Sequence, residues 1–233
     1  MTHFTHNQFC PISLAADILS KKWTLLVLRE LHLGASSFNY MKKGLPGISP
    51  TVLSSRLRDL IHHGIITNEN HNIASKNPRY RLTKSGMATA GILEQLGNWS
   101  QTYVPAARVL EHTNPGLLLR DMARSIKTEF MPMERPTIAI IFTDQPGNLS
   151  NWLLKPEANG TMTASIDEQT GQEVDLHVMS TLEDMTAVWM GIEPLANAIR
   201  HKRITLTGNL NLKTSFEQWF GLSHFSNISK IAS

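Results

Sequence analysis

Apolar residues recur with the period of a helix at the start of the chain. The stretch from Asp17 to Leu33 has this period and is followed by Gly34, so it is predicted to form one amphipathic helix. A second, shorter helix is predicted to begin near Ser37 and to stop before Pro46. Both would present one apolar face to a shared core, so the chain opens as a helical assembly.

A third helix has clear start and stop signals. Ser49 can accept a hydrogen bond from an otherwise unpaired backbone N–H, Pro50 fits the first helical position, and Gly64 tolerates left-handed geometry at the end. Its core stripe is predicted to consist of Leu53, Leu57 and Leu60, with Ile61 beside them. The opposite face carries short hydroxyl side chains and basic residues: Thr51, Ser54, Ser55, Arg58 and His62.

That polar face has two interpretations. It could be an ordinary solvated surface, although such surfaces usually carry longer Glu and Lys side chains. Short hydroxyls with one Arg would instead let the helix approach a groove and donate to base edges or phosphates. The tight turn before Ser49 joins the second and third helices, which is typical of a helix-turn-helix.

Two strand-like runs follow and favour the second interpretation. "GIITNENHNI" and "RYRLT" are separated by the turn-rich "ASKNP", which contains Lys76. A two-stranded hairpin with a basic tip after a recognition helix is a wing that can lie along the DNA backbone. Thr83 is then predicted to cap a further long helix, "KSGMATAGILEQLGNWSQTYV".

"EHTNPG" interrupts this pattern near residue 112, so we predict domains at 1–112 and 113–233. The second stretch reads as an α+β domain with helices around a sheet of about four strands. Predicted strands include "TIAIIF", "TMTASID", "EVDLHVMS" and "RITLTG". Thr181 and Asp184 form a variant capping box at the start of "TLEDMTAVWMG", and a further helix is predicted from Pro194 to His201.

Charge is distributed unevenly along the 233 residues. Residues 1–112 hold 12 Lys and Arg against 6 Asp and Glu, a balance of +6, whereas residues 113–233 hold 10 against 13, a balance of −3. Only the first part is therefore expected to meet a polyanion. The sequence contains no run of about 18 apolar residues and no secretory signal pattern, so a cytoplasmic location is expected.

The first part resembles the HxlR family of winged-helix transcription regulators, which are similar to MarR-type proteins. The resemblance rests on "CP" at Cys10 and Pro11, "KWTLLVLREL", "FNYMKKGLPGISPTVLSSRLRDL", "GII" and "YRLTKSG". It implies sequence-specific binding of double-stranded DNA by a homodimer, with the recognition helix at Pro50 to His62 and the wing tip near Ala74 to Pro78. Dimer contacts are implied for the N-terminal segment and for Lys84 to Tyr103.

Arg58 is the foremost candidate for a base contact, because an exposed Arg can bind guanine with two hydrogen bonds. Arg56 lies beside the core stripe and could serve either DNA binding or the fold. The complete set of candidate DNA contacts is Lys42, Lys43, Ser49, Thr51, Ser54, Ser55, Arg56, Arg58, His62, Lys76 and Arg79.

The second part is similar to the sterol carrier protein type 2 fold from Leu117 to Leu222. The resemblance rests on Asp175 within "EVDLHVMSTLEDMTAVWMG" and on "IEPLANAIRHKRITLTGNLNLKTSFEQWFGLS". It implies an apolar tunnel for a lipid, fatty acyl group or sterol, and hence an effector domain. Candidate lining residues, each of which could equally be ordinary core, are Trp189, Met190, Leu195, Ile199, Leu206, Leu212, Phe216, Trp219 and Phe220.

Cys10 is the only cysteine and leaves two interpretations open. It could be a redox sensor near a dimer interface, or it could simply pack at the domain edge. His3, His6 and Cys10 are too few and too close to the terminus for a metal site to be expected. Without GxSxG, HExxH or a phosphate-binding glycine loop, no enzyme activity or cofactor is expected.

Two functions therefore compete. The first is a homodimeric repressor whose DNA affinity responds to a small apolar ligand in the C-terminal domain. The alternative is a thiol-redox regulator that uses Cys10 and keeps the C-terminal domain as a scaffold. Replacing Cys10 with Ser would separate these functions.

Overall fold

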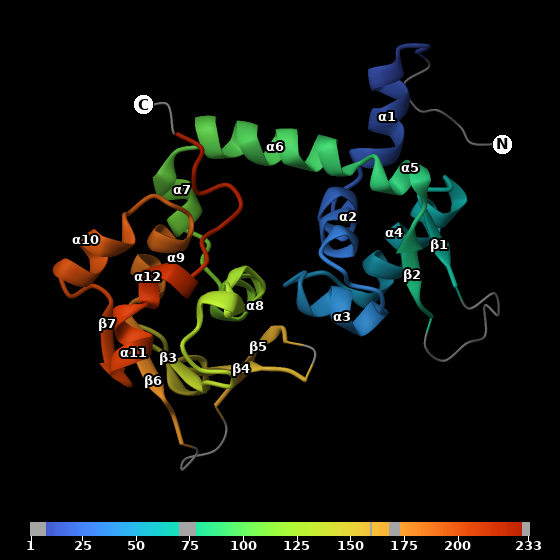
Figure 1. The fold of residues 1–233 in the computed structure, drawn as a ribbon. Helices are drawn as coiled ribbons and strands as arrows, with labels where there is room; N and C mark the ends of the chain where they lie inside the picture. The colour runs from blue at the N-terminus through green and yellow to red at the C-terminus, as the bar shows by residue number, and fades with distance from the viewer. Residues whose placement is uncertain (1–7, 70–77, 159, 168–172, 230–233) are drawn as a thin grey trace. The chain divides into compact units, whose positions relative to one another are not determined.

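The fold is given by a computed structural model that describes residues 8–69, 78–158, 160–167 and 173–229 (Figure 1). The chain divides into two compact units, residues 1–97 and residues 98–233. Each unit has its own apolar core. They are described separately below as the first unit and the second unit.

The first unit is a set of short helices followed by a two-stranded hairpin (Figure 1). Its elements are α1 (Pro11–Leu19), α2 (Thr24–His32), α3 (Phe38–Lys43), α4 (Pro50–His62), β1 (Ile66–Asn68), β2 (Tyr80–Leu82), α5 (Lys84–Met87) and the first half of α6 (Ala90–Tyr103). The strands β1 and β2 are antiparallel, with Ile66 opposite Leu82. The predicted winged helix-turn-helix architecture is thus present, and residues 70–77 at the wing tip lie outside the described residues.

Two predicted long helices are each divided in the structure. The prediction of one helix from Asp17 to Leu33 was wrong, because Trp23 adopts a left-handed backbone with φ of 79° and separates α1 from α2. The helix predicted after Thr83 is likewise interrupted between α5 and α6, where the Thr89 hydroxyl donates to the Gly86 carbonyl oxygen at 2.7 Å. These breaks give the first unit shorter helices that turn around its core.

The core of the first unit confirms most of the predicted stripe of α4. Leu53, Leu57 and Leu60 are each at most 2% exposed and pack among side chains of α2 and α3. Ile61 is instead 39% exposed, so its assignment to the core stripe was wrong. Gly64 takes the predicted left-handed conformation, with φ of 65°, where the chain leaves α4 for the wing.

The second unit is an α+β assembly around one five-stranded sheet (Figure 1). After α7 (Ala106–Leu110), its helices are α8 (Pro115–Ser125), α9 (Leu182–Trp189), α10 (Leu195–Arg200), α11 (Leu210–Thr214) and α12 (Phe216–Trp219), with 3-10 turns η1 (Thr128–Phe130) and η2 (Gly147–Leu149). The strands are β3 (Ile138–Phe142), β4 (Asn151–Pro156), β5 (Met162–Ile166), β6 (Leu176–Ser180) and β7 (Thr205–Gly208). The predicted sheet of about four strands lacked β4.

The sheet has the strand order β5-β4-β3-β6-β7. Only the central pair β3 and β6 is parallel, with Ile138 opposite Leu176, and every other pair is antiparallel. A parallel pair requires a long connection between its strands, and here β4 and β5 occupy that connection. Thr181 caps α9 as predicted: its hydroxyl oxygen accepts from the Asp184 N–H at 3.0 Å.

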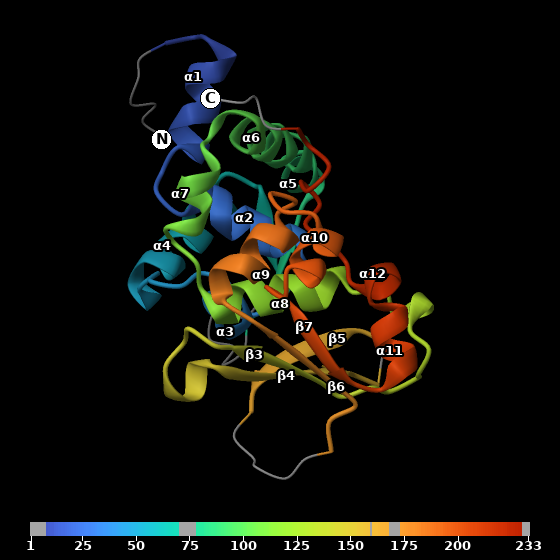
Figure 2. The same cartoon turned by 90° about the vertical axis from the view of Figure 1, so that its left-hand side faces the viewer.

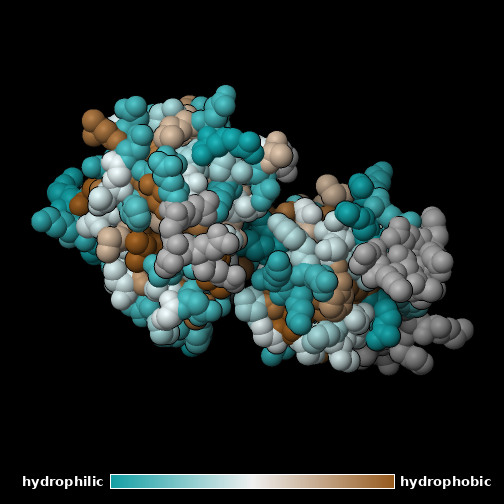
Figure 3. Space-filling model, turned by 90° about the horizontal axis from the view of Figure 1, so that it is seen from below, coloured by the Kyte–Doolittle hydropathy of each residue, from teal (hydrophilic) through white to brown (hydrophobic). Residues whose placement is uncertain are grey.

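Helices cover one side of this sheet (Figure 2). Side chains from alternate positions, such as Ile138, Ile140 and Phe142, form the core with α8, α9 and α12. The outer side includes Leu153, which is buried, and Met179, which is 38% exposed. A view from below shows brown apolar atoms beside teal polar ones on the second unit (Figure 3). The main core therefore lies between the sheet and its helices.

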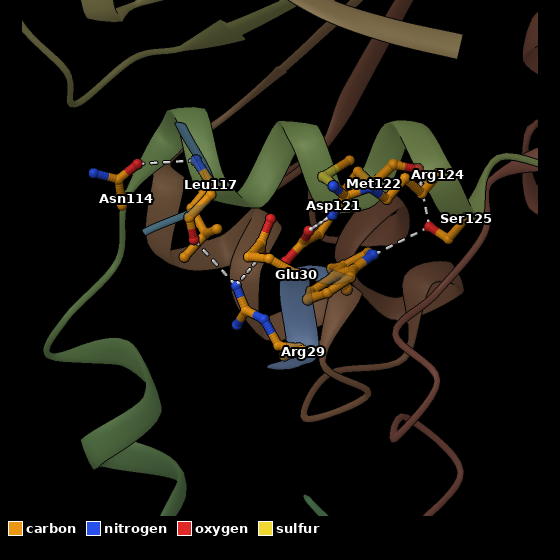
Figure 4. A network of polar contacts seen from close by, with 10 residues as sticks. Arg29, Glu30, Asn114, Leu117, Asp121, Met122, Arg124 and Ser125 are labelled. Atoms are coloured by element: carbon orange, nitrogen blue, oxygen red, sulfur yellow. Dashed lines mark hydrogen bonds and ion pairs between the residues drawn. The ribbon is translucent and has the colours of Figure 1, made fainter. Parts of the chain in front are cut away.

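Polar contacts fix α8 at both ends (Figure 4). The Asn114 Oδ1 accepts from the Leu117 N–H at 2.9 Å, which caps the start of the helix. Near the end, Arg124 donates to the Asp121 carboxylate at 2.6 Å, and the Trp189 indole donates to the Ser125 hydroxyl at 3.3 Å. The first two contacts stabilise α8 itself, and the Trp189 indole joins its end to α9.

The division between the two units falls inside α6, whereas the predicted domain boundary lies near residue 112. Gln101, in the second half of α6, is buried, and its side-chain amide donates to the Met190 carbonyl oxygen at 3.0 Å. The end of α6 therefore packs with the second unit. None of the described helices is long and apolar enough to cross a membrane.

Gly221 shows how tightly the second unit is packed. A Cβ at this position would lie 1.6 Å from the Ser125 carbonyl oxygen, far inside van der Waals contact. Gly221→Ala is expected to lower the free energy of unfolding by about 1–3 kcal/mol or more, because the backbone must shift. Urea unfolding would measure this change. Gly91→Ala in α6 is the control, because a Cβ at position 91 meets no atom within 4 Å. This variant should leave the free energy of unfolding unchanged or raise it slightly.

Candidate nucleic-acid interface

Ser49 caps the start of α4, as predicted. The Ser49 Oγ accepts from the Val52 N–H at 3.2 Å while the Ser49 backbone is extended, and Pro50 occupies the first helical position. The turn before it contains Gly47 with φ of 85°, a left-handed conformation that favours glycine. This local geometry fixes where α4 begins relative to α3, and hence which of its side chains face outward.

The outward face of α4 carries a free cation. Arg58 is exposed, and its guanidinium makes no hydrogen bond or ion pair with any residue in the described part of the chain. Thr51 and His62 are exposed on the same helix, whereas Ser54 and Ser55 are half-buried. The polar face predicted from the sequence is thus present, with Arg58 as its charged member.

Arg56 has a different environment although it is only two residues away. Its side chain is 17% exposed, its Nη1 lies 3.4 Å from the Asp59 Oδ2, and its Nη2 donates to the Ser55 Oγ at 3.2 Å. The same Asp59 oxygen accepts from the Lys21 Nζ at 3.2 Å. Arg56 is therefore held within the fold, and the Ser55 hydroxyl is engaged with it.

The wing adds further basic groups. Arg79 is exposed just before β2, its Nη1 donates to the Ser36 Oγ at 3.4 Å, and the Tyr80 N–H donates to the Ser36 carbonyl oxygen at 2.8 Å. Arg81 lies two positions further on β2 and pairs with Glu69. The sequence analysis missed Arg81, although the two-residue period of a strand places it on the same face as Arg79. Lys76 lies outside the described residues.

Two lysines end α3. Lys42 and Lys43 are exposed in its last turn, before Gly44. The Ser37 hydroxyl caps the other end of this helix by accepting from the Tyr40 N–H at 3.3 Å. Both lysines can therefore reach a phosphate from the helix that precedes α4.

A hollow of about 400 Å³ lies behind the wing in the first unit. Tyr80 and Leu82 from β2, Met87 from α5 and Leu31 from α2 contribute apolar walls. Burial raises the pKa of the Tyr80 phenol above its ordinary value.

The nine candidate ligand residues fall into two groups in the second unit. Leu212, Phe216, Trp219 and Phe220 are at most 5% exposed and belong to its core, where Phe216 stacks on Phe220 at 4.8 Å between ring centres. The other five are half-buried, and four of them pack against that core: Trp189, Leu195, Ile199 and Leu206, with Met190 at the end of α9. None of the nine lines the hollow behind the wing, or a second hollow formed by residues 128–135 and the hairpin after β4.

Cys10 is a half-buried free thiol directly before α1. Its carbonyl oxygen accepts from the Leu14 N–H at 3.1 Å. His3 and His6 lie outside the described residues. Among the residues described, no group of three or more His, Cys, Asp or Glu side chains is placed to hold a metal ion.

Several known proteins are similar to about two fifths of the chain, including the following matches. Residues 18–108 match the family described as HxlR-like helix-turn-helix. YvaP of Bacillus subtilis, described as an uncharacterized HTH-type transcriptional regulator, is 32% identical over 42% of this chain and 92% of its own. The similarly described sll1512 of Synechocystis is 37% identical over 39% of this chain and 67% of its own. The solved redox regulator HypR in its oxidized form is 27% identical, with a TM-score of 0.36 over 40% of this chain and 95% of its own.

The contrast between the two arginines of α4 predicts opposite effects on stability. Arg56→Ala should lower the free energy of unfolding by about 1 kcal/mol, because it removes a half-buried ion pair and the packing of its stem. Arg58→Ala, its matched control on the same helix, should change stability by less than about 0.5 kcal/mol. Urea unfolding of both variants tests this, and equal losses would contradict the assignment.

Proposed function

Because the chain belongs to the HxlR-like helix-turn-helix family, we propose that it is a sequence-specific DNA-binding transcriptional regulator that acts as a homodimer. The observation that carries the proposal is the exposed Arg58 guanidinium, which is free on α4 while its neighbour Arg56 is bound within the fold. The major groove of DNA admits an α-helix, and an exposed guanidinium on that helix can form two hydrogen bonds with one guanine.

The other basic and hydroxyl groups have positioning roles in this proposal. We propose that Thr51 and His62 accompany Arg58 in the major groove, and that Ser49, which caps α4, and the half-buried Ser54 and Ser55 help to position that helix on the DNA backbone. The backbone contacts come from groups on either side of α4, namely Lys42 and Lys43 on α3 and Arg79 at the wing. We propose Lys76 as a further phosphate contact on its sequence position alone.

Arg58→Ala is expected to weaken binding to the DNA sequence that the chain prefers in a selection from a random library. The expected loss is about 10-fold to 100-fold, because the variant lacks a bidentate base contact. Fluorescence anisotropy with a labelled duplex measures this loss. Arg200→Ala removes the same charge from an exposed position of the second unit and should leave the affinity unchanged. Equal affinity of the Arg58 variant and the unaltered chain would contradict the proposed role.

The proposed dimer uses the apolar side chains that α1 and α6 expose. Phe9 is 97% and Ile12 79% exposed at the start of the chain. On α6 the exposed residues follow a spacing of three and four that places them on one helical face: Ile92, Leu96, Trp99 and Tyr103. Exposed apolar stripes of this kind are typical of surfaces that a second subunit covers.

Trp99→Glu is expected to shift the chain toward a monomer, because the variant puts a charge into an apolar interface. Sedimentation velocity measures the change, and far-ultraviolet circular dichroism controls for folding. Trp99 is 60% exposed, so the fold itself should tolerate the substitution. The variant should also lose DNA affinity, because a monomer cannot bind two half-sites together. A variant that remains dimeric would contradict this interface.

We further propose that a small apolar ligand in the second unit modulates DNA binding. The proposal is supported by the sequence resemblance of residues 117–222 to sterol carrier proteins. It is also supported by the five half-buried candidate residues, four of which pack against the core. Such a ligand acts only if it prefers one geometry of the dimer. Native mass spectrometry of the purified chain, followed by extraction, tests it: a stoichiometric lipid supports the proposal, and a chain that stays empty with a lipid panel contradicts it.

Redox control through Cys10 is the alternative. It is favoured by one observation: the half-buried thiol lies between the exposed Phe9 and Ile12, on the surface proposed to be covered by the second subunit. An oxidant would then change DNA affinity in the unaltered chain and leave Cys10→Ser unaffected. Equal oxidant responses of both proteins would contradict this alternative.

A further inference from the structure

The second unit contains a hollow that none of the residues discussed above explains. It has a volume of about 640 Å³, within the size range of small-molecule sites. Two separate segments form it: residues 128–135, which include η1 and the loop after it, and residues of the hairpin between β4 and β5. It is therefore distinct from the nine candidate ligand residues, which lie on or beside α9 to α12 and β7.

The floor of this hollow is formed by methionines. Met162 is 5% exposed and belongs to the core, and Met131 and Met133 are half-buried against that core. Their thioether side chains are flexible and polarizable, which suits an irregular or aromatic apolar ligand. All three methionines therefore connect the apolar lining of the hollow with the core.

The rim of the hollow is mainly acidic. Glu129, Glu134 and Glu157 are exposed around it, against the single cation Arg135. The Glu157 carboxylate accepts from the Thr163 hydroxyl at 3.0 Å, while Glu129 and Glu134 form no ion pair with any residue that the structure describes. The rim thus carries more negative than positive charge beside its methionines.

We propose that this hollow binds a lipophilic organic cation, whose apolar body lies on the methionine floor and whose positive charge is paired by the rim carboxylates. A neutral lipid could form no ion pair with the rim carboxylates, and an organic anion would be repelled by them. The inference concerns binding alone, and it holds whether or not the chain regulates transcription.

Two probes of the same shape and opposite charge test this inference on the full chain without DNA. Tetraphenylphosphonium should bind at one molecule per chain, and tetraphenylborate should bind about tenfold more weakly or not at all. Isothermal titration calorimetry measures both affinities. Equal binding of the two ions, or absence of phosphonium binding, would overturn the proposal.

Variants locate the bound cation. The triple variant Glu129→Gln, Glu134→Gln and Glu157→Gln should bind tetraphenylphosphonium about tenfold more weakly, whereas Arg135→Gln should bind it about threefold more tightly. Glu183→Gln with Glu217→Gln changes exposed carboxylates elsewhere on the second unit and should leave the affinity unchanged. All of these positions are exposed, so folding is retained. Phosphonium binding that is insensitive to the rim variants would place the site elsewhere and overturn the inference.

Discussion

The Asp59 carboxylate pairs with Arg56 and not with Arg58, so the two arginines of α4 differ in their environment. One oxygen of this carboxylate lies 3.4 Å from Arg56 and 3.2 Å from Lys21, so two cations of the first unit are joined to one anion. This arrangement ties α4 to the turn before α2 and withdraws Arg56 from the surface. Arg58 is exposed on the outward face without a hydrogen bond or ion pair to any residue that the structure describes, and the proposal of DNA binding depends on that difference.

The sequence predicted the helix-turn-helix and the wing well because their signals are local. The Ser49 cap, the left-handed Gly64 and the leucine stripe of α4 each follow from a few neighbouring residues. The break at Trp23 could not be predicted in this way, because a left-handed backbone at a bulky residue is maintained by tertiary packing. The third member of the Asp59 group, Lys21, is likewise hidden from local spacing, because it lies 38 residues from Asp59 in the chain.

The second unit shows the limits of hydrophobic spacing as a guide to function. The same pattern that favours a tunnel also produces a packed core, and Leu212, Phe216, Trp219 and Phe220 are core residues here. The hollow floored by Met131, Met133 and Met162 is formed instead by a loop and a hairpin that meet only after folding. Its sequence signal, acidic residues among methionines and prolines, is too diffuse to identify beforehand.

In the proposed function, α4 recognises the base sequence of DNA and the chain binds as a two-fold dimer. Selection of bound duplexes from a random DNA library by the full chain tests both properties together. We expect enrichment of an inverted repeat whose half-sites lie about one helical turn apart, about 34–36 Å. Selection that enriches no sequence, with binding that depends only on salt, would contradict it.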